Sequence, residues 1–177
     1  MNRHQQIQSV LEHSTIKHYT QGKVWYWEAH NYAKQLSQQF NLSLQVVCGI
    51  IAALSPLKEW GLNMRVAKQF IEGKRNVHTK LQMLKAESIL EGRDIEKSLG
   101  GLKTVNFYFN LLNPPDPNWL TLDRHMFWMF KTKPCLTPKQ YNKLKTETIN
   151  YATETGWIPS ELQATLWLTV KDIKHDL

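Results

Sequence analysis

Two residues in the second half of the chain bring an amine and a carboxylate to the predicted starts of two helices. Lys103 follows a pair of glycines, and Asp123 comes twenty residues later. A lysine amine can act as a nucleophile, and a carboxylate can accept a proton or stabilise positive charge during a reaction. We therefore take Lys103 and Asp123 as candidate catalytic residues, with His125 as a secondary acid–base candidate.

Each of these residues also has a purely structural interpretation. An aspartate directly before a helix, such as Asp123, is an ordinary N-cap. A surface lysine such as Lys103 can contact a phosphate or only solvent, and a histidine such as His125 is often bonded to the backbone. The residue types alone leave catalysis and scaffolding open.

The charge of the chain favours a polyanionic partner. Its 177 residues include 22 Lys and Arg against 15 Asp and Glu, which gives a formal net charge of +7. Such an excess is typical of proteins that bind nucleic acid. The basic pair Lys74 and Arg75 could contact phosphates, although short basic runs are usually solvated.

Composition also restricts the compartment and the cofactors. Cys48 and Cys135 are too few for a disulfide framework or an iron–sulfur cluster. The polar N-terminus lacks the apolar core of a secretory signal, and the longest apolar run, Val46–Leu54, is far shorter than the roughly 20 residues that a bilayer requires. We expect a cytoplasmic protein that contacts no membrane, holds no metal and has no obligate protein partner.

Apolar residues recur at helical spacing along most of the chain, and hardly any segment alternates with period two. The pattern predicts an all-α fold of roughly eight or nine helices in one domain, residues 1–177. The expected helices are residues 24–40, 43–54, 60–72, 81–90, 94–99, 102–112, a helix from Asp123, 137–155 and 160–173. The helix with the strongest apolar character, 43–54, should lie at the centre.

The helix 102–112 should have one apolar and one polar face. The apolar positions expected to be buried are Leu102, Val105, Phe109 and Leu112. The polar stripe on the opposite face consists of Lys103, Asn106 and Asn110. This pattern predicts that Lys103 is exposed.

The order of these elements resembles the helix-hairpin-helix (HhH-GPD) DNA glycosylases, the superfamily of endonuclease III and 8-oxoguanine glycosylase. The chain is also similar to small phage-type relatives of that superfamily. The segments that carry the resemblance are the apolar helix 47–55 ending in serine, the helix 85–90, the glycine turn and lysine helix 99–106, the proline-rich loop 113–117 and the hydrophobic-Asp-x-His segment 122–128.

The resemblance implies roles for the first two candidates. Lys103 matches the lysine that forms a Schiff base in the bifunctional members, and Asp123 matches the aspartate that nearly all members keep. The hairpin, about residues 94–112, would bind a DNA phosphate through Gly100, Gly101 and Thr104. This chain has adjacent glycines where the family usually has Gly-x-Gly. The resemblance implies no cluster or other cofactor, and it leaves room for a monovalent cation at the hairpin.

A buried base must leave the duplex before it can be processed, and the resemblance points to one segment for this step. Leu57 could wedge into the base stack, and Glu59 or Trp60 could line the pocket for the extruded base. Trp60 also fits a core position.

We therefore expect DNA as the partner and a base-excision enzyme as the function: a DNA glycosylase acting in DNA repair on a modified or damaged base, with AP lyase activity if Lys103 is the nucleophile. One alternative is a phage-type enzyme that remodels hypermodified thymines and leaves the glycosidic bond intact. Another is a non-catalytic DNA-binding module on a glycosylase scaffold.

Overall fold

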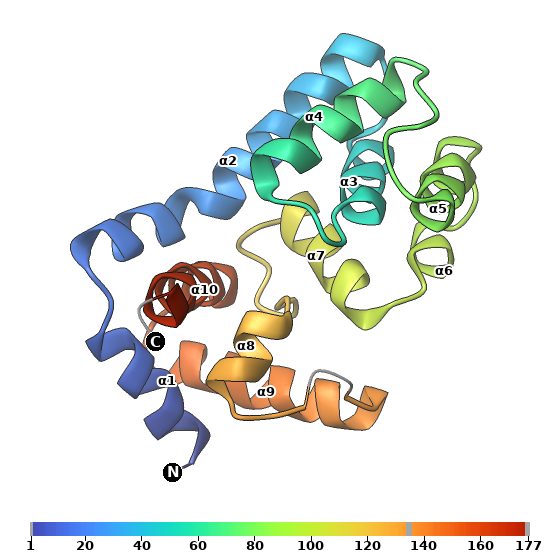
Figure 1. Ribbon diagram of the computed structural model, residues 1–177. Helices are drawn as coiled ribbons and strands as arrows, with labels where there is room; N and C mark the ends of the chain where they lie inside the picture. The colour runs from blue at the N-terminus through green and yellow to red at the C-terminus, as the bar shows by residue number, and fades with distance from the viewer. Residues whose placement is uncertain (1, 134–135, 176–177) are drawn as a thin grey trace. The chain divides into compact units, whose positions relative to one another are not determined.

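The computed structural model describes residues 2–133 and 136–175, except for the side chains of residues 174 and 175 (Figure 1). All regular structure in these ranges is α-helical, so the prediction of an all-α fold is confirmed. The helices are α1 (Arg3–Glu12), α2 (Ile16–Phe40), α3 (Leu44–Leu54), α4 (Trp60–Ile71), α5 (Lys80–Leu90), α6 (Ile95–Leu99), α7 (Leu102–Leu112), α8 (Arg124–Met129), α9 (Pro138–Glu154) and α10 (Pro159–His175).

These ten described helices include one that the sequence pattern did not predict. Helix α1 is mostly polar and buries only Gln6 and Ile7. A capping box fixes its start, because the Asn2 side chain accepts a hydrogen bond from the Gln5 backbone N–H and the Gln5 side chain accepts one from the Asn2 N–H. Its narrow buried face packs against α8, α9 and α10 and gives little apolar periodicity.

The helices form two compact units, one built from both ends of the chain and the other from its middle. Unit 1 contains both ends, Met1–Glu28 and Asn113–Leu177, and unit 2 contains the middle, Ala29–Leu112. Helix α2 begins in unit 1 and ends in unit 2. The single domain of residues 1–177 stays a prediction.

Unit 2 is built around α3, as the sequence predicts. Ser43 caps the helix through the Val46 N–H, and all residues from Val47 to Leu54 are buried. Helices α4, α5, α6 and α7 pack against α3. Gly49 permits this packing, since a Cβ there would lie 3.0 Å from an Ile95 methyl group.

Unit 1 is centred on α10, which packs against α1, α8 and α9. The predicted capping box at the start of α9 is confirmed at Thr137 and Gln140. The predicted box at Ser160 is wrong, because α10 already begins at Pro159. The Ser160 hydroxyl instead donates to the carbonyl oxygen of Pro114 at 2.7 Å and lies buried.

Candidate functional site

Asp123 is the N-cap of α8 in unit 1, with an extended backbone. Its Oδ1 accepts hydrogen bonds from the backbone N–H groups of His125 at 2.9 Å and Met126 at 3.2 Å. Its Oδ2 accepts a hydrogen bond from the indole Nε1 of Trp167 at 3.0 Å. The structural interpretation of Asp123 as a cap is confirmed, and its catalytic role stays a prediction.

Two buried tyrosines lie close to this carboxylate. The Tyr141 hydroxyl accepts a hydrogen bond from the Leu122 N–H at 3.0 Å, and the Tyr26 hydroxyl donates one to Oε1 of Gln163 at 2.8 Å. Burial raises the pKa of both phenols above the usual value, and the negative charge of Asp123 raises it further. Both tyrosines are therefore neutral hydrogen-bonding groups at neutral pH.

His125 belongs to the same group of side chains. Its ring is half-buried and meets the Trp167 ring edge-on, with 6.2 Å between centroids and an interplanar angle of 86°. The structure thus brings His125 and Asp123 together within unit 1. An acid–base role for this imidazole stays a prediction.

The second candidate centre is the turn between α6 and α7 in unit 2. Gly100 ends α6 with a left-handed backbone, φ 68°, and its N–H donates to the carbonyl oxygen of Glu96 at 2.9 Å. Glycine suits this conformation because it has no Cβ to clash. Gly101 then precedes α7, and its carbonyl oxygen accepts hydrogen bonds from the Thr104 hydroxyl and the Val105 N–H. A tight two-glycine turn therefore joins the helices of residues 95–112.

Lys103 lies in the first turn of α7 and is exposed, as predicted. Lys103 belongs to unit 2, whereas Asp123 belongs to unit 1. Their cooperation in one active site stays a prediction.

A second ammonium group at this turn was missed by the sequence reasoning. Lys85 of α5 donates a hydrogen bond from Nζ to the carbonyl oxygen of Leu99 at 2.6 Å. The same Nζ would lie 3.8 Å from a Cβ built on Gly100. The ammonium group of Lys85 therefore places a positive charge at this turn. Only packing of α5 against α6 reveals this contact, since the two residues are 14 apart in sequence.

The predicted faces of α7 are wrong in part. Asn106 and Asn110 are buried, at 2% and 0% exposure, together with the apolar residues Phe107, Tyr108 and Leu111. The residues predicted as the apolar inner face, Leu102, Val105, Phe109 and Leu112, are only half-buried. The Asn106 amide nitrogen donates within the helix to the Leu102 carbonyl at 2.7 Å, whereas its Oδ1 is buried without a hydrogen-bond partner among the described residues. The polarity of single residues did not predict which face of α7 is buried, because apolar residues lie on several sides of this helix.

The loop between α3 and α4 carries an exposed leucine. Leu57 is 89% exposed and has φ 61°, a left-handed conformation that costs a branched residue about 1–2 kcal/mol. The loop is held by a hydrogen bond from the Lys58 N–H to the Ser55 carbonyl at 3.2 Å. A second bond joins Nε2 of His78 to the Pro56 carbonyl at 3.0 Å.

The two neighbouring candidates of this loop differ in environment. Glu59 is exposed at the N-cap position of α4, and its side chain makes no capping hydrogen bond. Trp60 is half-buried and meets Phe107 of α7 edge-on, with 6.4 Å between ring centroids. Trp60 thus packs between α4 and α7 of unit 2, and its role in a base pocket stays a prediction.

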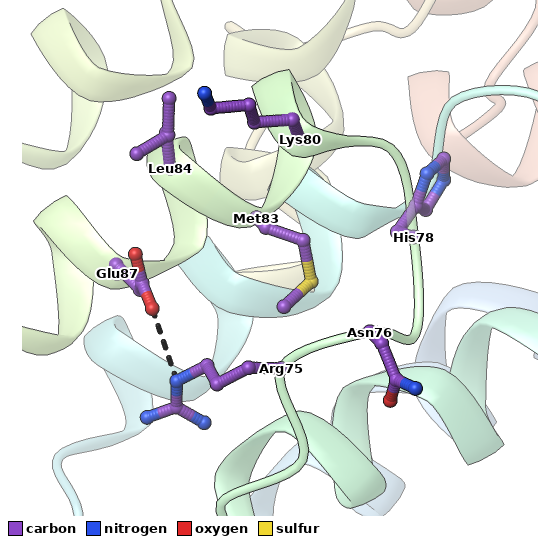
Figure 2. Close-up of a pocket in the computed structure, with 7 residues that line it drawn as sticks. All are labelled: Arg75, Asn76, His78, Lys80, Met83, Leu84 and Glu87. Atoms are coloured by element: carbon purple, nitrogen blue, oxygen red, sulfur yellow. Dashed lines mark ion pairs between the residues drawn. The ribbon is translucent and has the colours of Figure 1, made fainter.

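Arg75, one of the predicted phosphate contacts, lines a surface pocket of about 420 Å³ (Figure 2). The pocket is lined by Arg75, Asn76, His78, Lys80, Met83, Leu84 and Glu87. Nε of Arg75 forms an ion pair with Glu87 at 3.0 Å, and its guanidinium lies 4.5 Å from the Phe70 ring centroid. Lys74 is exposed. The positive charge of Arg75 is therefore already balanced by Glu87 within unit 2. Lys74 and Arg75 both remain predicted DNA contacts.

No group of three or more His, Cys, Asp or Glu residues in the described ranges could hold a metal ion. No single described helix is long and apolar enough to cross a membrane, and α2 with α3 meets the length and composition criteria only as a pair bent by 118°.

Comparison with known proteins identifies the family. Searches of curated proteins and of solved structures gave no match. A family model matches residues 2–174, almost the whole chain, and its family is described as one of unknown function. The chain therefore belongs to DUF7178, a family of unknown function.

Proposed function

We propose that this protein is a DNA glycosylase that removes a modified or damaged base, with Asp123 as its essential carboxylate. The proposal rests on the Asp123 carboxylate at the start of α8, within the segment that resembles the glycosylases. This carboxylate accepts hydrogen bonds from two backbone N–H groups and from the indole of Trp167. N–H donors stabilise the charged form of a carboxylate. A fixed negative charge suits a reaction in which a sugar becomes positively charged.

The chemistry follows from the two candidate groups. As the bond between C1′ and the base nitrogen breaks, its electron pair leaves with the base, and Asp123 stabilises the positive charge on the sugar. In the simple glycosylase, water attacks C1′ and gives a proton to the carboxylate. In the lyase version, the Lys103 amine attacks C1′ as the base leaves and gives a proton to Asp123. The C1′–O4′ bond then breaks, O4′ takes up a proton, and the nitrogen and C1′ form an imine. Removal of a C2′ proton expels the 3′ phosphate by β-elimination, and water hydrolyses the imine to release the lysine.

Features of unit 2 support the binding of DNA. The turn at Gly100 and Gly101 precedes the N-terminus of α7, where backbone N–H groups attract a phosphate. Lys85 and Lys103 bring two positive charges to the same turn and helix. The exposed, strained Leu57 is of a residue type that proteins insert between bases.

The first test uses duplexes with uracil, oxidised, alkylated, hydroxymethylated and abasic sites. Asp123→Asn keeps an N-cap residue but removes the charge, so we expect correct folding and a loss of base release of about a hundredfold or more. Asp94→Asn is the matched control, because Asp94 caps α6 through the Lys97 N–H at 2.8 Å. Full activity of Asp123→Asn, or no product from the wild type, would contradict the proposal.

Mass spectrometry of the same reactions identifies the chemistry. Excision releases free base, whereas the alternative of thymine remodelling leaves the nucleoside intact with a changed substituent. Free base that depends on Asp123 supports the glycosylase, and an altered nucleoside supports remodelling.

The lyase version has a separate test. Borohydride should trap a covalent complex of the wild type with abasic DNA, and Lys103→Ala should abolish it. Lys171→Ala is the control, because this amine lies 4.5 Å from the Trp167 ring in unit 1 and so tests a lysine near Asp123. Trapping that is lost with Lys171 instead would exclude Lys103 as the nucleophile. A wild type that never cross-links would leave only a lysine-independent glycosylase.

The cap geometry also favours a second candidate, a DNA-binding module without catalysis. The two backbone N–H contacts of Asp123 are those that a structural N-cap aspartate makes. In that case Asp123→Asn leaves DNA affinity unchanged and no duplex in the panel yields a product.

A further inference from the structure

The two oxygens of Asp123 are held in different ways. Oδ1 accepts the two backbone N–H groups at the start of α8, which any capping aspartate does. Oδ2 accepts the indole N–H of Trp167, which comes from α10, 44 residues later. Because an N-cap needs only Oδ1, capping does not account for the contact between Oδ2 and Trp167.

The Trp167 ring is itself held on several sides. Trp25 of α2 and His125 of α8 meet it edge-on, with centroids 6.0 Å and 6.2 Å away. The ammonium of Lys171, one turn further along α10, lies 4.5 Å from its centroid. These contacts restrict rotation of the indole and direct its N–H to Oδ2.

An indole N–H can only donate a hydrogen bond. It therefore needs an acceptor, which the Oδ2 lone pairs of Asp123 supply. Two nearby titratable groups, Tyr26 of α2 and Tyr141 of α9, interact with the charge of Asp123, and two more, His125 of α8 and Lys171 of α10, contact the Trp167 ring. Both tyrosines stay protonated at neutral pH, so they add no negative charge that would oppose the carboxylate.

We propose that Trp167 is the positioning residue of Asp123, because the indole N–H of Trp167 fixes the orientation of Oδ2. The contact itself is independent of any reaction, but its value for catalysis rests on the proposed glycosylase function. Trp167 touches no substrate in this proposal and acts only through Asp123.

The test replaces the donor and keeps a ring. In Trp167→Phe, the ¹³C signal of the Asp123 side-chain carboxyl should shift from its wild-type position at neutral pH, because Oδ2 loses its donor. Trp157→Phe is the control, since Trp157 stacks on Tyr19 in unit 1. Asp123→Asn assigns the signal. An unchanged Asp123 signal in a folded Trp167→Phe protein would overturn the proposal.

A second measurement needs no change at position 167. Among the seven indole N–H signals of the chain, one should shift in Asp123→Asn, because the group that accepts its hydrogen bond has changed. If no indole signal responds to Asp123, the proposal is wrong. This result holds whether or not Trp167→Phe folds.

Kinetics separate this inference from the proposed function. If the wild type excises a base, Trp167→Phe should lower kcat about tenfold with little change in KM, because DNA binding does not use the indole. If the wild type has no activity while the carboxyl and indole signals shift as expected, the glycosylase proposal fails and the positioning of Asp123 stands. An unchanged kcat in an active Trp167→Phe enzyme would reject the positioning role alone.

Discussion

At the scale of single residues, Leu57 combines two unfavourable properties. Its side chain is 89% exposed and its backbone is left-handed. Such strain persists only where neighbouring structure imposes it, and it gathers at functional sites. Here the hydrogen bonds at Pro56 and Lys58 impose it. Both properties would suit a leucine side chain that inserts between stacked bases.

Leu57→Gly should therefore separate stability from function. Glycine relieves the left-handed strain but adds freedom to the unfolded chain, so the free energy of unfolding should change by no more than about 1 kcal/mol. Base extrusion, followed by 2-aminopurine fluorescence in a duplex, should fall strongly. Leu81→Ala changes a leucine that is 59% exposed on α5 and should leave extrusion intact. Normal extrusion by Leu57→Gly would refute the wedge.

His78 should make the stability of unit 2 depend on pH. Its Nδ1 accepts the Thr79 N–H at 2.6 Å while Nε2 donates to the Pro56 carbonyl, an arrangement that requires a neutral imidazole. Burial lowers the pKa of His78 below 6.5, and the charge of Lys58 lowers it further. The unfolded chain then binds more protons than the folded one just below pH 6.5, so the stability from this group is lost as the pH falls.

Urea unfolding followed by tryptophan fluorescence tests this at about pH 7 and about pH 5. The wild type should lose stability at the lower pH, and His78→Gln should lose less because it cannot be protonated. Equal losses in both proteins would show that His78 does not cause the dependence.

At the scale of elements, two glycines in helices have opposite surroundings. A Cβ on Gly22 of α2 would lie 2.7 Å from both the backbone N and the Cα of Thr165 in α10, so these helices meet backbone to backbone within unit 1. A Cβ on Gly61 of α4 would have nothing within 4 Å. One glycine permits packing, and the other only weakens its helix.

Alanine at the two positions should change stability in opposite directions. Gly22→Ala must push α10 away and should lower the free energy of unfolding by about 1–3 kcal/mol. Gly61→Ala should raise it by about 0.5–1 kcal/mol, the usual gain over glycine in a helix. Urea denaturation measures both. If Gly22→Ala were as stable as Gly61→Ala, the close approach of α2 and α10 would be wrong.

At the scale of the whole molecule, the candidate residues are divided between the two units. Unit 1 carries Asp123, His125 and Trp167, and unit 2 carries Lys103 and Leu57. Because the chain leaves unit 1 within α2 and returns to it at Asn113, unit 1 is built from two segments distant in sequence, whereas unit 2 is one continuous segment. The net charge of +7 belongs to the chain as a whole.

This charge should give DNA binding a marked dependence on salt. The logarithm of the binding constant should fall linearly with the logarithm of the salt concentration, by about 0.9 for each phosphate contacted in duplex DNA. Lys103→Ala should make the slope shallower by about one contact. Lys143→Ala should not, because Lys143 already lies 3.9 Å from Glu147. Fluorescence anisotropy between about 50 and 200 mM salt gives the slopes. Affinity without salt dependence would argue against phosphate binding.

The sequence by itself determined the local features of this protein. Helical periodicity predicted nine of the ten described helices, including the buried α3. Turn and cap residues predicted the end of α6 at Gly100 and the starts of α8 at Asp123 and α9 at Thr137. These features depend on neighbours within about four residues, so they can be recognised without knowing the fold.

Only the tertiary structure decided which distant groups meet. The bond from Trp167 to Asp123, the ammonium of Lys85 at the Leu99 carbonyl and the burial of Asn106 left no trace in local spacing. Each depends on how separate helices pack against one another, which the local spacing of residue types does not record. The sequence thus placed the candidate carboxylate at the start of a helix, while the fold of unit 1 supplied the indole that holds its second oxygen.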